Sequence, residues 1–441
     1  MMKKICIMLI FLTFLLKAHS LELINMQSSL ADIFASSIDS NEGLTSFRSL
    51  NIPSGGRTEA LGTAFTGLCD DISFFDYNPA ASATLEETQI AVYHNSWISD
   101  SAIETLAATA RTGNTGYGFQ LKCFYVPFSE YNLYGDRVAG SYYTETTGTF
   151  NISHNFFAGY LFKGLSLGAN AKLSWRGVPD YTDNKDDSII SNSGLEQSAL
   201  GLMADAGVLF HFNAFKFFSA RKANFNIGLA LNNLGIVLTG FSSSIQTDSP
   251  PPTKLSAGIS YRPFSRILFT GEFRKPLNLQ NTSSSEKASF AVGSDIKLTE
   301  KFSFLCGFLL QGSNPRISMG SEFEFKKILL DVTYTFDLTS SANPVNHISL
   351  SAKMKLGDRG RFAAIEQVNK YYLEGLRLYA EGYYDAAVLK WNESIRIAQS
   401  APLNMTFEPA IIAKKIAINF NKNKYELENL YSISFDDDDE E

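Results

Sequence analysis

A few histidines and serines are the residues of this sequence whose types could carry out chemistry. A lipid-hydrolysing site would need a serine whose proton passes to a neighbouring histidine. The histidines are scattered along the chain, so each is interpreted as a polar residue of a strand. We therefore predict that the protein is not an enzyme, with a lipid hydrolase as an alternative. Outside the N-terminal leader described below, the histidines are His94, His154, His211 and His347.

Cysteines and charge exclude other classes of site. Once the N-terminal leader described below is removed, Cys69, Cys123 and Cys306 remain, an odd number without paired spacing, so neither a disulfide framework nor a zinc site is predicted. No metal and no cofactor are expected. The formal charge is −7, of which residues 436–441 contribute −6, and no basic stripe is present. Nucleic-acid binding is therefore not expected.

The first residues have the order of a secretory signal peptide, assigned to residues 1–20. Lys3 and Lys4 precede an apolar run at 5–16, and small residues follow near Ser20. After this leader no apolar run approaches the roughly 20 residues that a membrane-spanning helix needs. If the protein crosses a membrane, we expect it to do so with strands.

Apolar and polar residues alternate through residues 86–356. From Leu165 to Trp175 every odd position is apolar and every even one is polar or glycine, and the rhythm returns at 328–336 and 348–356. Such segments reach about ten residues, enough for a tilted strand to cross the hydrocarbon, whereas soluble sandwich strands usually have about five or six. We predict an all-β transmembrane barrel that is apolar outside and wet inside, with a large soluble β-protein as the alternative.

The barrel is predicted to have about 14 antiparallel strands, with tight turns in the periplasm and longer loops outside the cell. The expected extracellular loops are 130–143, 179–194, 241–252 and 277–286. Aromatic residues near strand ends are interpreted as an interfacial girdle, or else as ordinary packing: Tyr93, Trp97, Phe156, Phe157, residues 210–218, Tyr261 and Phe264. The predicted strand starts are Gln89, Ala102, Gly116, Thr146, Leu165, Gln197, Ala223, Lys254, Arg266, Lys287, Phe302, Arg316, Lys327 and Asn346.

A stretch rich in glycine and small residues precedes the first strand, within the N-terminal segment 21–85. It contains the acidic pair Asp70 and Asp71 and then Asn78-Pro79-Ala80. Asn78 can cap a helix, and Pro79 fits its first position, where a missing amide proton costs nothing. The pattern predicts a short helix from Pro79 towards residue 85.

These motifs together resemble the FadL family of long-chain fatty acid transporters, over about residues 47–356. The Phe-Arg-Ser-Leu phrase at 47–50, the Gly-Gly-Arg-Thr-Glu run at 55–59 and the Asn-Pro-Ala triplet resemble its treponemal FadL-like branch, an uncharacterised family. The resemblance implies a barrel of 14 strands, a hydrophobic ligand and an N-terminal hatch inside the lumen. A barrel this wide would leak unless something filled it. The hatch residues implied are Gly55, Gly56, Gly62, Asn78, Pro79 and Ala80.

The periodicity becomes helical over residues 362–420. The stretch 371–391 is similar to a tetratricopeptide repeat, in which small residues let two antiparallel helices approach and large ones fill the gap. We predict a helical hairpin that binds a partner protein, a further helix at 407–420 and an acidic tail at 421–441. The matching positions are Gly375, Leu378, Gly382, Tyr384, Ala387, Trp391 and Ser394.

Two functions follow for a protein of the outer membrane with its C-terminal module in the periplasm. The first is passive uptake of long-chain fatty acids or other hydrophobic molecules through a barrel gated by the hatch. The alternative is a FadL-like scaffold whose helical repeat recruits periplasmic partners. Contact with outer-membrane lipids is expected in both.

Overall fold

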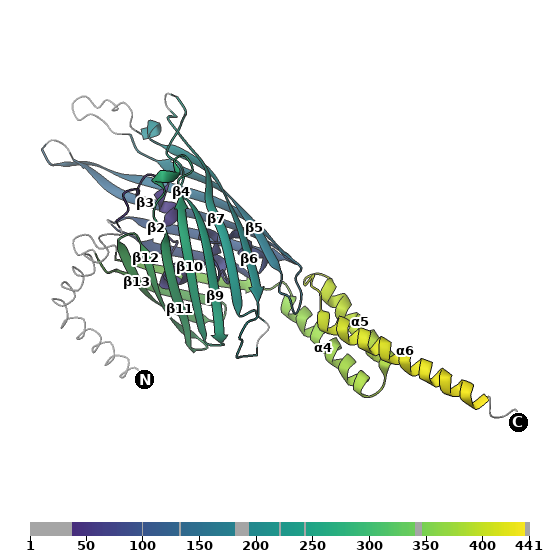
Figure 1. Ribbon diagram of the computed structural model, residues 1–441. Helices are drawn as coiled ribbons and strands as arrows, with labels where there is room; N and C mark the ends of the chain where they lie inside the picture. The colour runs from purple at the N-terminus through teal and green to yellow at the C-terminus, as the bar shows by residue number, and fades with distance from the viewer. Residues whose placement is uncertain are drawn as a thin grey trace, which may run out of the picture.

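The computed structural model describes residues 38–98, 100–131, 134–180, 194–219, 222–241, 244–339 and 346–436. Within them, 14 strands form one closed antiparallel barrel (Figure 1), because β6 pairs with β7 and β1 pairs with β15. The two-residue β8 (Gln246–Thr247) is added beside β7. The barrel strands are β1 (Thr88–Ser96), β2 (Ala102–Thr112), β3 (Thr115–Tyr131), β4 (Arg137–Phe156), β5 (Leu165–Gly177), β6 (Ala199–Phe212), β7 (Phe225–Thr239), β9 (Thr253–Phe264), β10 (Ile267–Leu277), β11 (Ser289–Thr299), β12 (Phe302–Gln311), β13 (Asn314–Phe325), β14 (Ile328–Asp337) and β15 (His347–Gly357).

The two ends of the barrel differ in their connections. At one end, here called the turn end, two residues join β2 to β3, β9 to β10, β11 to β12 and β13 to β14. The opposite loop end carries most of the longer connections, including those from β5 to β6, β7 to β9 and β10 to β11. Exceptions include the two-residue turn from β12 to β13 at the loop end and the connection 213–224 from β6 to β7 at the turn end. Short 3-10 helices at the loop end are η5 (Gly194–Glu196) and η6 (Thr282–Ser284). The predicted loops at 241–252 and 277–286 thus lie together at the loop end.

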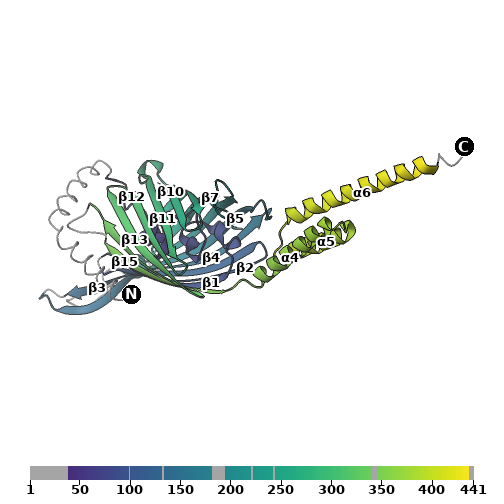
Figure 2. The same cartoon turned by 90° about the horizontal axis from the view of Figure 1, so that it is seen from below.

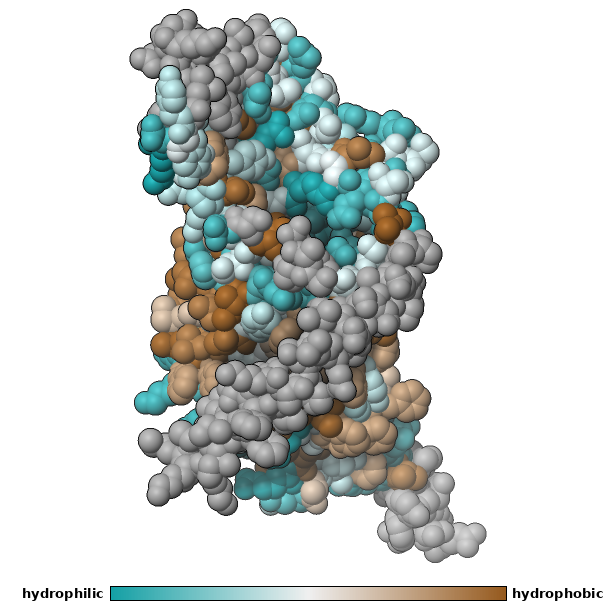
Figure 3. All heavy atoms as spheres, turned by 90° about the vertical axis from the view of Figure 1, so that its left-hand side faces the viewer, coloured by the Kyte–Doolittle hydropathy of each residue, from teal (hydrophilic) through white to brown (hydrophobic). Residues whose placement is uncertain are grey.

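Side chains alternate between the two faces of the wall, as the sequence predicts. In β1, Ile90 and Val92 point outward and are 36% and 52% exposed, while Gln89 and Asn95 are buried towards the lumen. Figure 3 shows apolar side chains along the flank of the barrel and polar ones gathered at the loop end. The outside therefore presents the apolar face and the lumen the polar one.

Two predictions about the wall are wrong. Residues 130–143 were expected to form a loop, but β3 and β4 continue through most of this stretch and are 17 and 20 residues long, while the other barrel strands have 9–15. Beyond the hydrocarbon a strand needs no apolar face, so polar residues there still pair as a hairpin.

Tyr93, assigned to the interfacial girdle, is 3% exposed and faces the lumen. Phe157 and Phe264, by contrast, are exposed near the turn end, as the girdle requires.

The N-terminal part of the described chain runs inside the barrel, where Figures 1 and 2 show it in purple. We call residues 45–85 the luminal segment. It contains η2 (Arg48–Asn51), the short helix α3 (Arg57–Ala60), η3 (Ile72–Asp76) and η4 (Pro79–Ala83). The predicted short helix from Pro79 is present as η4, a 3-10 helix. The predicted signal peptide at 1–20 lies outside the described residues.

Three C-terminal helices lie outside the barrel at the turn end (Figures 1 and 2). They are α4 (Arg361–Ala380), α5 (Tyr384–Gln399) and α6 (Glu408–Asp436), here called the helical module. The last helix is longer than expected: residues 421–436, assigned to an acidic tail, continue α6 as a helix. Among the helices that the structure describes, none combines the length and apolar character needed to span a membrane.

Candidate functional site

The luminal segment crosses the lumen from the loop end to the turn end. At the loop end the backbone N–H of Ser46 donates to the carbonyl of Pro250 at 3.0 Å. At the turn end Arg111, beside the β2–β3 turn, donates to the carbonyl of Leu85 at 3.1 Å. Between these points the segment packs tightly, and the rings of Phe65 and Phe74 are fully buried. It therefore fills the interior rather than lying on the rim.

Glycines in the wall let the backbone of the segment approach closely. A Cβ added to Gly307 in β12 would lie 2.0 Å from the backbone nitrogen of Gly62. One added to Gly228 in β7 would lie 2.0 Å from the carbonyl oxygen of Thr66. Atoms that are not bonded do not approach so closely, so glycine is required at both wall positions. Gly62 itself has a φ of +62°, a backbone conformation that residues with a side chain rarely adopt.

A buried ion network ties the segment to one side of the wall. Arg57 lies 3.1 Å from the Asp295 carboxylate in β11 and 3.3 Å from Asp71. Lys353 in β15 bridges Asp71 of the segment at 2.7 Å and Asp331 of β14 at 3.0 Å. Removing one partner from such a buried pair costs about 3–5 kcal/mol. The network comprises Arg57, Asp70, Asp71, Asp295, Glu322, Asp331 and Lys353.

Further polar side chains of the wall accept hydrogen bonds from the backbone of the segment or donate hydrogen bonds to it. The Glu272 carboxylate of β10 accepts the backbone N–H groups of Phe65 at 2.7 Å and Thr66 at 2.8 Å. Asn151 of β4 donates to the carbonyl of Pro79 at 2.9 Å. These contacts satisfy backbone groups that have no sheet or long helix to pair with. The wall thus holds the segment mainly through its own inward-facing side chains.

The six predicted hatch residues all lie in this segment. Gly55 and Gly56 adopt positive φ values of +114° and +66°, and the Ser349 hydroxyl oxygen accepts a hydrogen bond from the N–H of Gly56 at 3.1 Å. Asn78 caps η4 by accepting the N–H of Ala80, and it donates to the carbonyl of Val208 in β6 at 2.9 Å. The motif residues are therefore contact points with the wall. The remaining two are Gly62, described above, and Pro79, the first residue of η4.

Sequence reasoning missed the wall residues that hold the segment, above all Glu272 and Lys353. The signal available was an isolated charged residue at an inward position of an otherwise alternating strand. Such a residue needs a partner when it is buried. The sequence could not name that partner, because Lys353 and Asp71 are 282 residues apart.

At the loop end the luminal segment makes an apolar contact with the wall. Phe47 and Leu50 pack against Ala199 and Met203 of β6 and Val237 of β7. Phe47 is 1% exposed. The wall therefore carries an apolar patch here, and the luminal segment covers it.

Comparison with known proteins assigns the chain to a family. Residues 24–359 match the family described as "Uncharacterised protein family (UPF0164)". The chain belongs to this family. A UPF0164 protein of Treponema pallidum (strain Nichols) is 31% identical over 385 residues, which cover 84% of each chain. A second UPF0164 protein of that strain is 26% identical over 384 residues, covering 82% of this chain and 74% of its own length.

Solved structures similar to this UPF0164 chain include the Pseudomonas putida toluene transporter TodX, with a TM-score of 0.46 and 9% identity. That likeness covers 68% of this chain and 98% of TodX. A Pseudomonas aeruginosa FadL homologue gives a TM-score of 0.43 and 10% identity, covering 69% of this chain and 99% of the homologue. The strand pairing of the UPF0164 chain itself establishes its closed barrel.

The helical module begins at Arg361, just after the UPF0164 match ends, and it is fixed to the turn end of the barrel. Arg361 donates to the carbonyl of Gly113 in the β2–β3 turn at 2.8 Å and to that of Pro402 at 2.7 Å. The Glu408 carboxylate accepts the N–H of Tyr160 in the β4–β5 connection at 2.8 Å. The rings of Tyr160 and Phe407 lie 5.1 Å apart. Contacts to two separate turns hold the module in one orientation.

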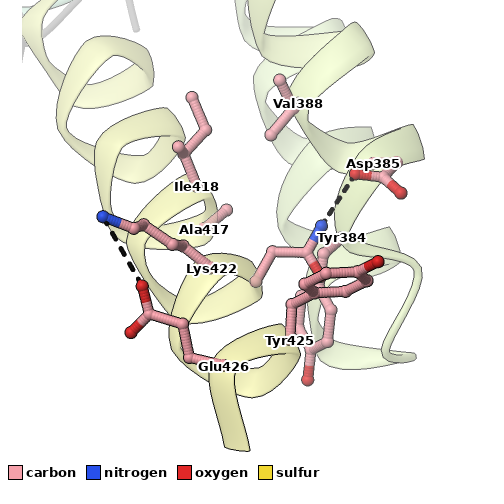
Figure 4. A pocket seen from close by; sticks show the side chains of 9 residues that line it. Tyr384, Asp385, Val388, Ala417, Ile418, Lys422, Tyr425 and Glu426 are labelled. Atoms are coloured by element: carbon pink, nitrogen blue, oxygen red, sulfur yellow. Dashed lines mark hydrogen bonds and ion pairs between the residues drawn. The ribbon is translucent and has the colours of Figure 1, made fainter. Parts of the chain in front are cut away.

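The residues assigned to the helical repeat mostly form the interior of the α4–α5 hairpin. A Cβ added to Gly375 would lie 2.4 Å from the indole nitrogen of Trp391, so only glycine lets the helices approach so closely. Trp391 and Ala387 are buried, and Leu378 packs against their cluster. Ser394 donates to the carbonyl of Val368 at 2.8 Å. Of the assigned residues, Gly382 lies in the turn between the helices, and Tyr384, labelled in Figure 4, is the first residue of α5.

The histidines of the UPF0164 chain contact different parts of the structure. His94 pairs with Glu104 of β2 at 2.7 Å, and His347 contacts Glu59 of the luminal segment. His154 and His211 bond to neighbouring strands, through Thr115 at 2.9 Å and Asn226 at 2.7 Å. They are spread around the barrel. The cysteines of the described residues, Cys69, Cys123 and Cys306, are free.

Proposed function

We propose that this protein is an outer-membrane channel for the passive uptake of long-chain fatty acids or other hydrophobic molecules. The observation that carries the proposal is a closed barrel, apolar outside, whose lumen is filled by a segment of its own chain. An apolar outer face suits lipid, and a filled lumen suits a channel that opens only on demand. Hydrophobic molecules cross a polar outer surface poorly, so a protein route for them is useful.

The orientation follows from the two ends of the barrel. In bacterial outer-membrane barrels the short turns face the periplasm and the longer loops face outward. On that basis the turn end and the helical module lie in the periplasm, and the loop end meets substrates arriving from outside. The proposed division of the chain is a signal peptide at 1–20, the N-terminal segment and hatch at 21–85, the barrel at 86–356 and the periplasmic module from 362.

The luminal segment is the proposed hatch. It precedes β1 and is joined to the barrel by the chain at residue 86, so the whole segment, η4 included, can leave the wall while the strands stay paired. Side chains such as Arg57 and Glu272 hold it, rather than a shared β-sheet. Exchanging these contacts for water would release the segment without opening the barrel wall.

The apolar patch at the loop end supports a hydrophobic substrate. Ala199, Met203 and Val237 are covered by Phe47 and Leu50 of the segment. Withdrawal of these two side chains would expose an apolar surface beside the entrance, while the ion network around Arg57 makes the middle of the lumen polar. A hydrophobic molecule would bind to this exposed patch, because it would take the place of the apolar side chains of the segment.

A reversible cross-link tests the gate. The hydroxyl oxygens of Ser82 in η4 and Ser153 in β4 lie 2.6 Å apart, so the Ser82→Cys/Ser153→Cys pair can lock the segment to the wall. Thr147→Cys/Ser174→Cys is the matched control, because these residues, 2.7 Å apart, join two wall strands. Both pairs are placed in a chain whose native cysteines are replaced by serine.

Refolded protein in lipid vesicles is expected to take up a fluorescent long-chain fatty acid. The lock at Ser82 and Ser153 should reduce uptake to that of empty vesicles, and a reductant should restore it, while the Thr147 and Ser174 pair leaves uptake unchanged. Uptake that continues with the lock closed would rule out the hatch. Absence of saturable fatty-acid binding by the unlocked protein would rule out fatty acids as its substrate.

A second candidate function is a scaffold that recruits periplasmic partners through the helical module, which we propose resembles a tetratricopeptide repeat. The observation that favours it is the module's fixed attachment to two turns through Arg361 and Glu408. A passive channel needs no such rigid extension.

A further inference from the structure

The connections between strands carry opposite charge at the two ends of the barrel. Among the residues that the structure describes, the loop-end connections contain six acidic residues and one basic residue, Lys287. The turn-end connections contain seven basic residues and one acidic residue, Glu300. The acidic residues of the loop end are Asp100, Asp136, Asp180, Glu196, Asp248 and Glu286, and the basic residues of the turn end are Lys163, Lys216, Lys222, Arg266, Lys301, Lys326 and Lys327. The turn end is therefore the positive end of the barrel.

Four of these cations lie on three neighbouring turns, here called the basic arc. Arg266 belongs to the β9–β10 turn, Lys301 to the β11–β12 turn, and Lys326 and Lys327 form the β13–β14 turn. Strands β9 to β14 follow one another in the sheet, so the three turns follow one another along the rim. All four residues are exposed. The helical module contacts the β2–β3 turn and the β4–β5 connection instead, and it leaves the arc accessible.

Other charges around the basic arc do not cancel it. The three turns, the three strand residues on either side of each turn and residues 355–360 contain four further basic residues and three acidic ones. One of the acidic residues, Glu324, is already paired with Lys355 at 2.6 Å. With the arc included, this part of the rim has five more positive than negative charges. The further residues are Arg262, Lys297, Lys355 and Arg359, and Glu300, Glu324 and Asp358.

Apolar side chains of the outer face adjoin the basic arc directly. Phe264 precedes the β9–β10 turn, Leu298 precedes the β11–β12 turn, and Phe325 and Ile328 enclose the two lysines of the β13–β14 turn. All four apolar side chains are exposed on the outside of the barrel. A soluble anion would meet only the charges of the arc. A phospholipid would meet both parts, with its headgroup at the cations and its acyl chains on the apolar face.

We propose that the basic arc binds the headgroups of anionic phospholipids in the periplasmic leaflet of the outer membrane. The lipid phosphate would accept hydrogen bonds from the Arg266 guanidinium and from the lysine ammonium groups of the neighbouring turns, because charge-assisted bonds of this kind are the strong ones. The acidic connections of the loop end would repel the same headgroups. The inference rests on the proposed function, which puts the turn end in the periplasm, and it names the lipid class that surrounds the channel there.

The test measures which lipid lies beside the arc, by the quenching of a tryptophan with brominated lipids. Phe325→Trp puts the reporter next to Lys326, and Phe336→Trp is the matched reporter at the other end of β14, where the outer face is also apolar and exposed. The unmodified chain gives the background of its 3 tryptophans. Each chain is refolded in phosphatidylcholine vesicles that contain increasing fractions of brominated phosphatidylglycerol or brominated phosphatidylcholine. Both leaflets have the same lipids, so the direction of insertion does not affect the result.

At Phe325→Trp, phosphatidylglycerol is expected to bind about fivefold more strongly than phosphatidylcholine, the effect of about one lysine or arginine on an anionic lipid. The preference should weaken as salt is added. At Phe336→Trp the two lipids should quench equally.

A charge variant tests the four residues of the arc. Arg266→Gln/Lys301→Gln/Lys326→Gln/Lys327→Gln, in the Phe325→Trp chain, should abolish the preference for phosphatidylglycerol. Lys414→Gln/Lys415→Gln/Lys422→Gln/Lys424→Gln is the matched control, because it removes the same charge from α6 of the helical module. It should keep the full preference.

Several results would overturn the proposal. Equal quenching by the two lipids at Phe325→Trp would mean that the arc does not select anionic headgroups. An equal preference at Phe325→Trp and Phe336→Trp, or a preference that survives in the arc variant, would place the selection elsewhere. Loss of the preference in excess glycerol 3-phosphate would make a soluble anion the occupant. Fatty-acid uptake is measured separately in vesicles without bromine, so a failure of this inference and a failure of the proposed function are distinguished.

Discussion

The guanidinium of Arg57 lies 3.1 Å from the carboxylate of Asp295, and this contact joins the luminal segment to strand β11 of the wall. Arg57 and Asp295 are both almost completely buried, so each charge is compensated by the other in place of water. The same guanidinium also contacts Asp70 and Asp71 of its own segment. One side chain therefore orders the segment and anchors it.

Replacing Arg57 by alanine should loosen the luminal segment. The change leaves several buried carboxylates without their cation, and we expect the segment to lose about 3–5 kcal/mol of its attachment. Hydrogen exchange of residues 54–76 in the refolded protein measures the effect. Arg396→Ala, which removes an exposed pair with Glu393, should change stability by no more than about 0.5 kcal/mol. Equal exchange in the two variants would contradict the anchoring role.

Replacing Gly307 by alanine should expel part of the luminal segment. The new methyl group would lie 2.0 Å from the backbone nitrogen of Gly62, and the backbone cannot give way as a flexible side chain would. We expect higher single-channel conductance in planar bilayers and faster proteolysis of the segment. Gly148→Ala is the control, because no described atom beyond Gly148 and its two chain neighbours lies within 4 Å of the added Cβ. Unchanged conductance in Gly307→Ala would argue against close packing at this point.

Acid should release the segment at the loop end. Burial alone would raise the pKa of Asp248, but the N–H of Ser249, the hydroxyl of Ser46 and Arg176 together hold that pKa below its usual value. Because the folded-state pKa is the lower one, the stabilisation is complete above the ordinary aspartate pKa of about 3.9 and is lost as pH falls through the folded value.

The measurement is protease cleavage near Ser46 between neutral pH and strong acid. Cleavage of the unmodified protein should increase only below pH of about 4, the region of the ordinary aspartate pKa. Asp248→Asn should be cleaved readily at neutral pH and lose this dependence. If both proteins keep the same pH profile, the contact among Asp248, Ser46 and Arg176 does not hold the segment.

Replacing Gly375 by alanine should separate α4 from α5. The added Cβ would lie 2.4 Å from the indole nitrogen of Trp391, which is fully buried, and overpacking of this kind costs about 1–3 kcal/mol. Faster hydrogen exchange in residues 361–399, with unchanged exchange in the barrel, is the expected result. Leu389→Ala, at a position that is 66% exposed, provides the comparison. A protected hairpin in Gly375→Ala would show that the helices pack differently.

The strands were largely predictable because one physical constraint repeats along the whole wall. Lipid outside and a polar lumen inside require alternation, and alternation can be read directly from the residues. The expected starts at Ala102, Leu165 and Phe302 coincide with those of β2, β5 and β12. The prediction failed where the constraint ends: β4 begins at Arg137 rather than Thr146, in a hairpin that extends beyond the apolar zone.

The local structure of the luminal segment could also be predicted from the sequence, but its contacts with the wall could not. Asn78 before Pro79 predicted a capped helix, since capping depends only on neighbours in the chain. The position of Tyr93 was mistaken because alternation by itself does not distinguish an aromatic ring that faces lipid from one that bonds to Ser73 inside the lumen.

The residues by themselves determined which side chains of each strand face inward and outward, because that depends on a two-residue period. Only the tertiary structure decided which inward residues meet the luminal segment. Arg57 and Asp295 are 238 positions apart, and closure of the barrel and the path of the segment bring them together. No local pattern encodes such a pair, since its energy depends on burial that exists only once the wall has closed.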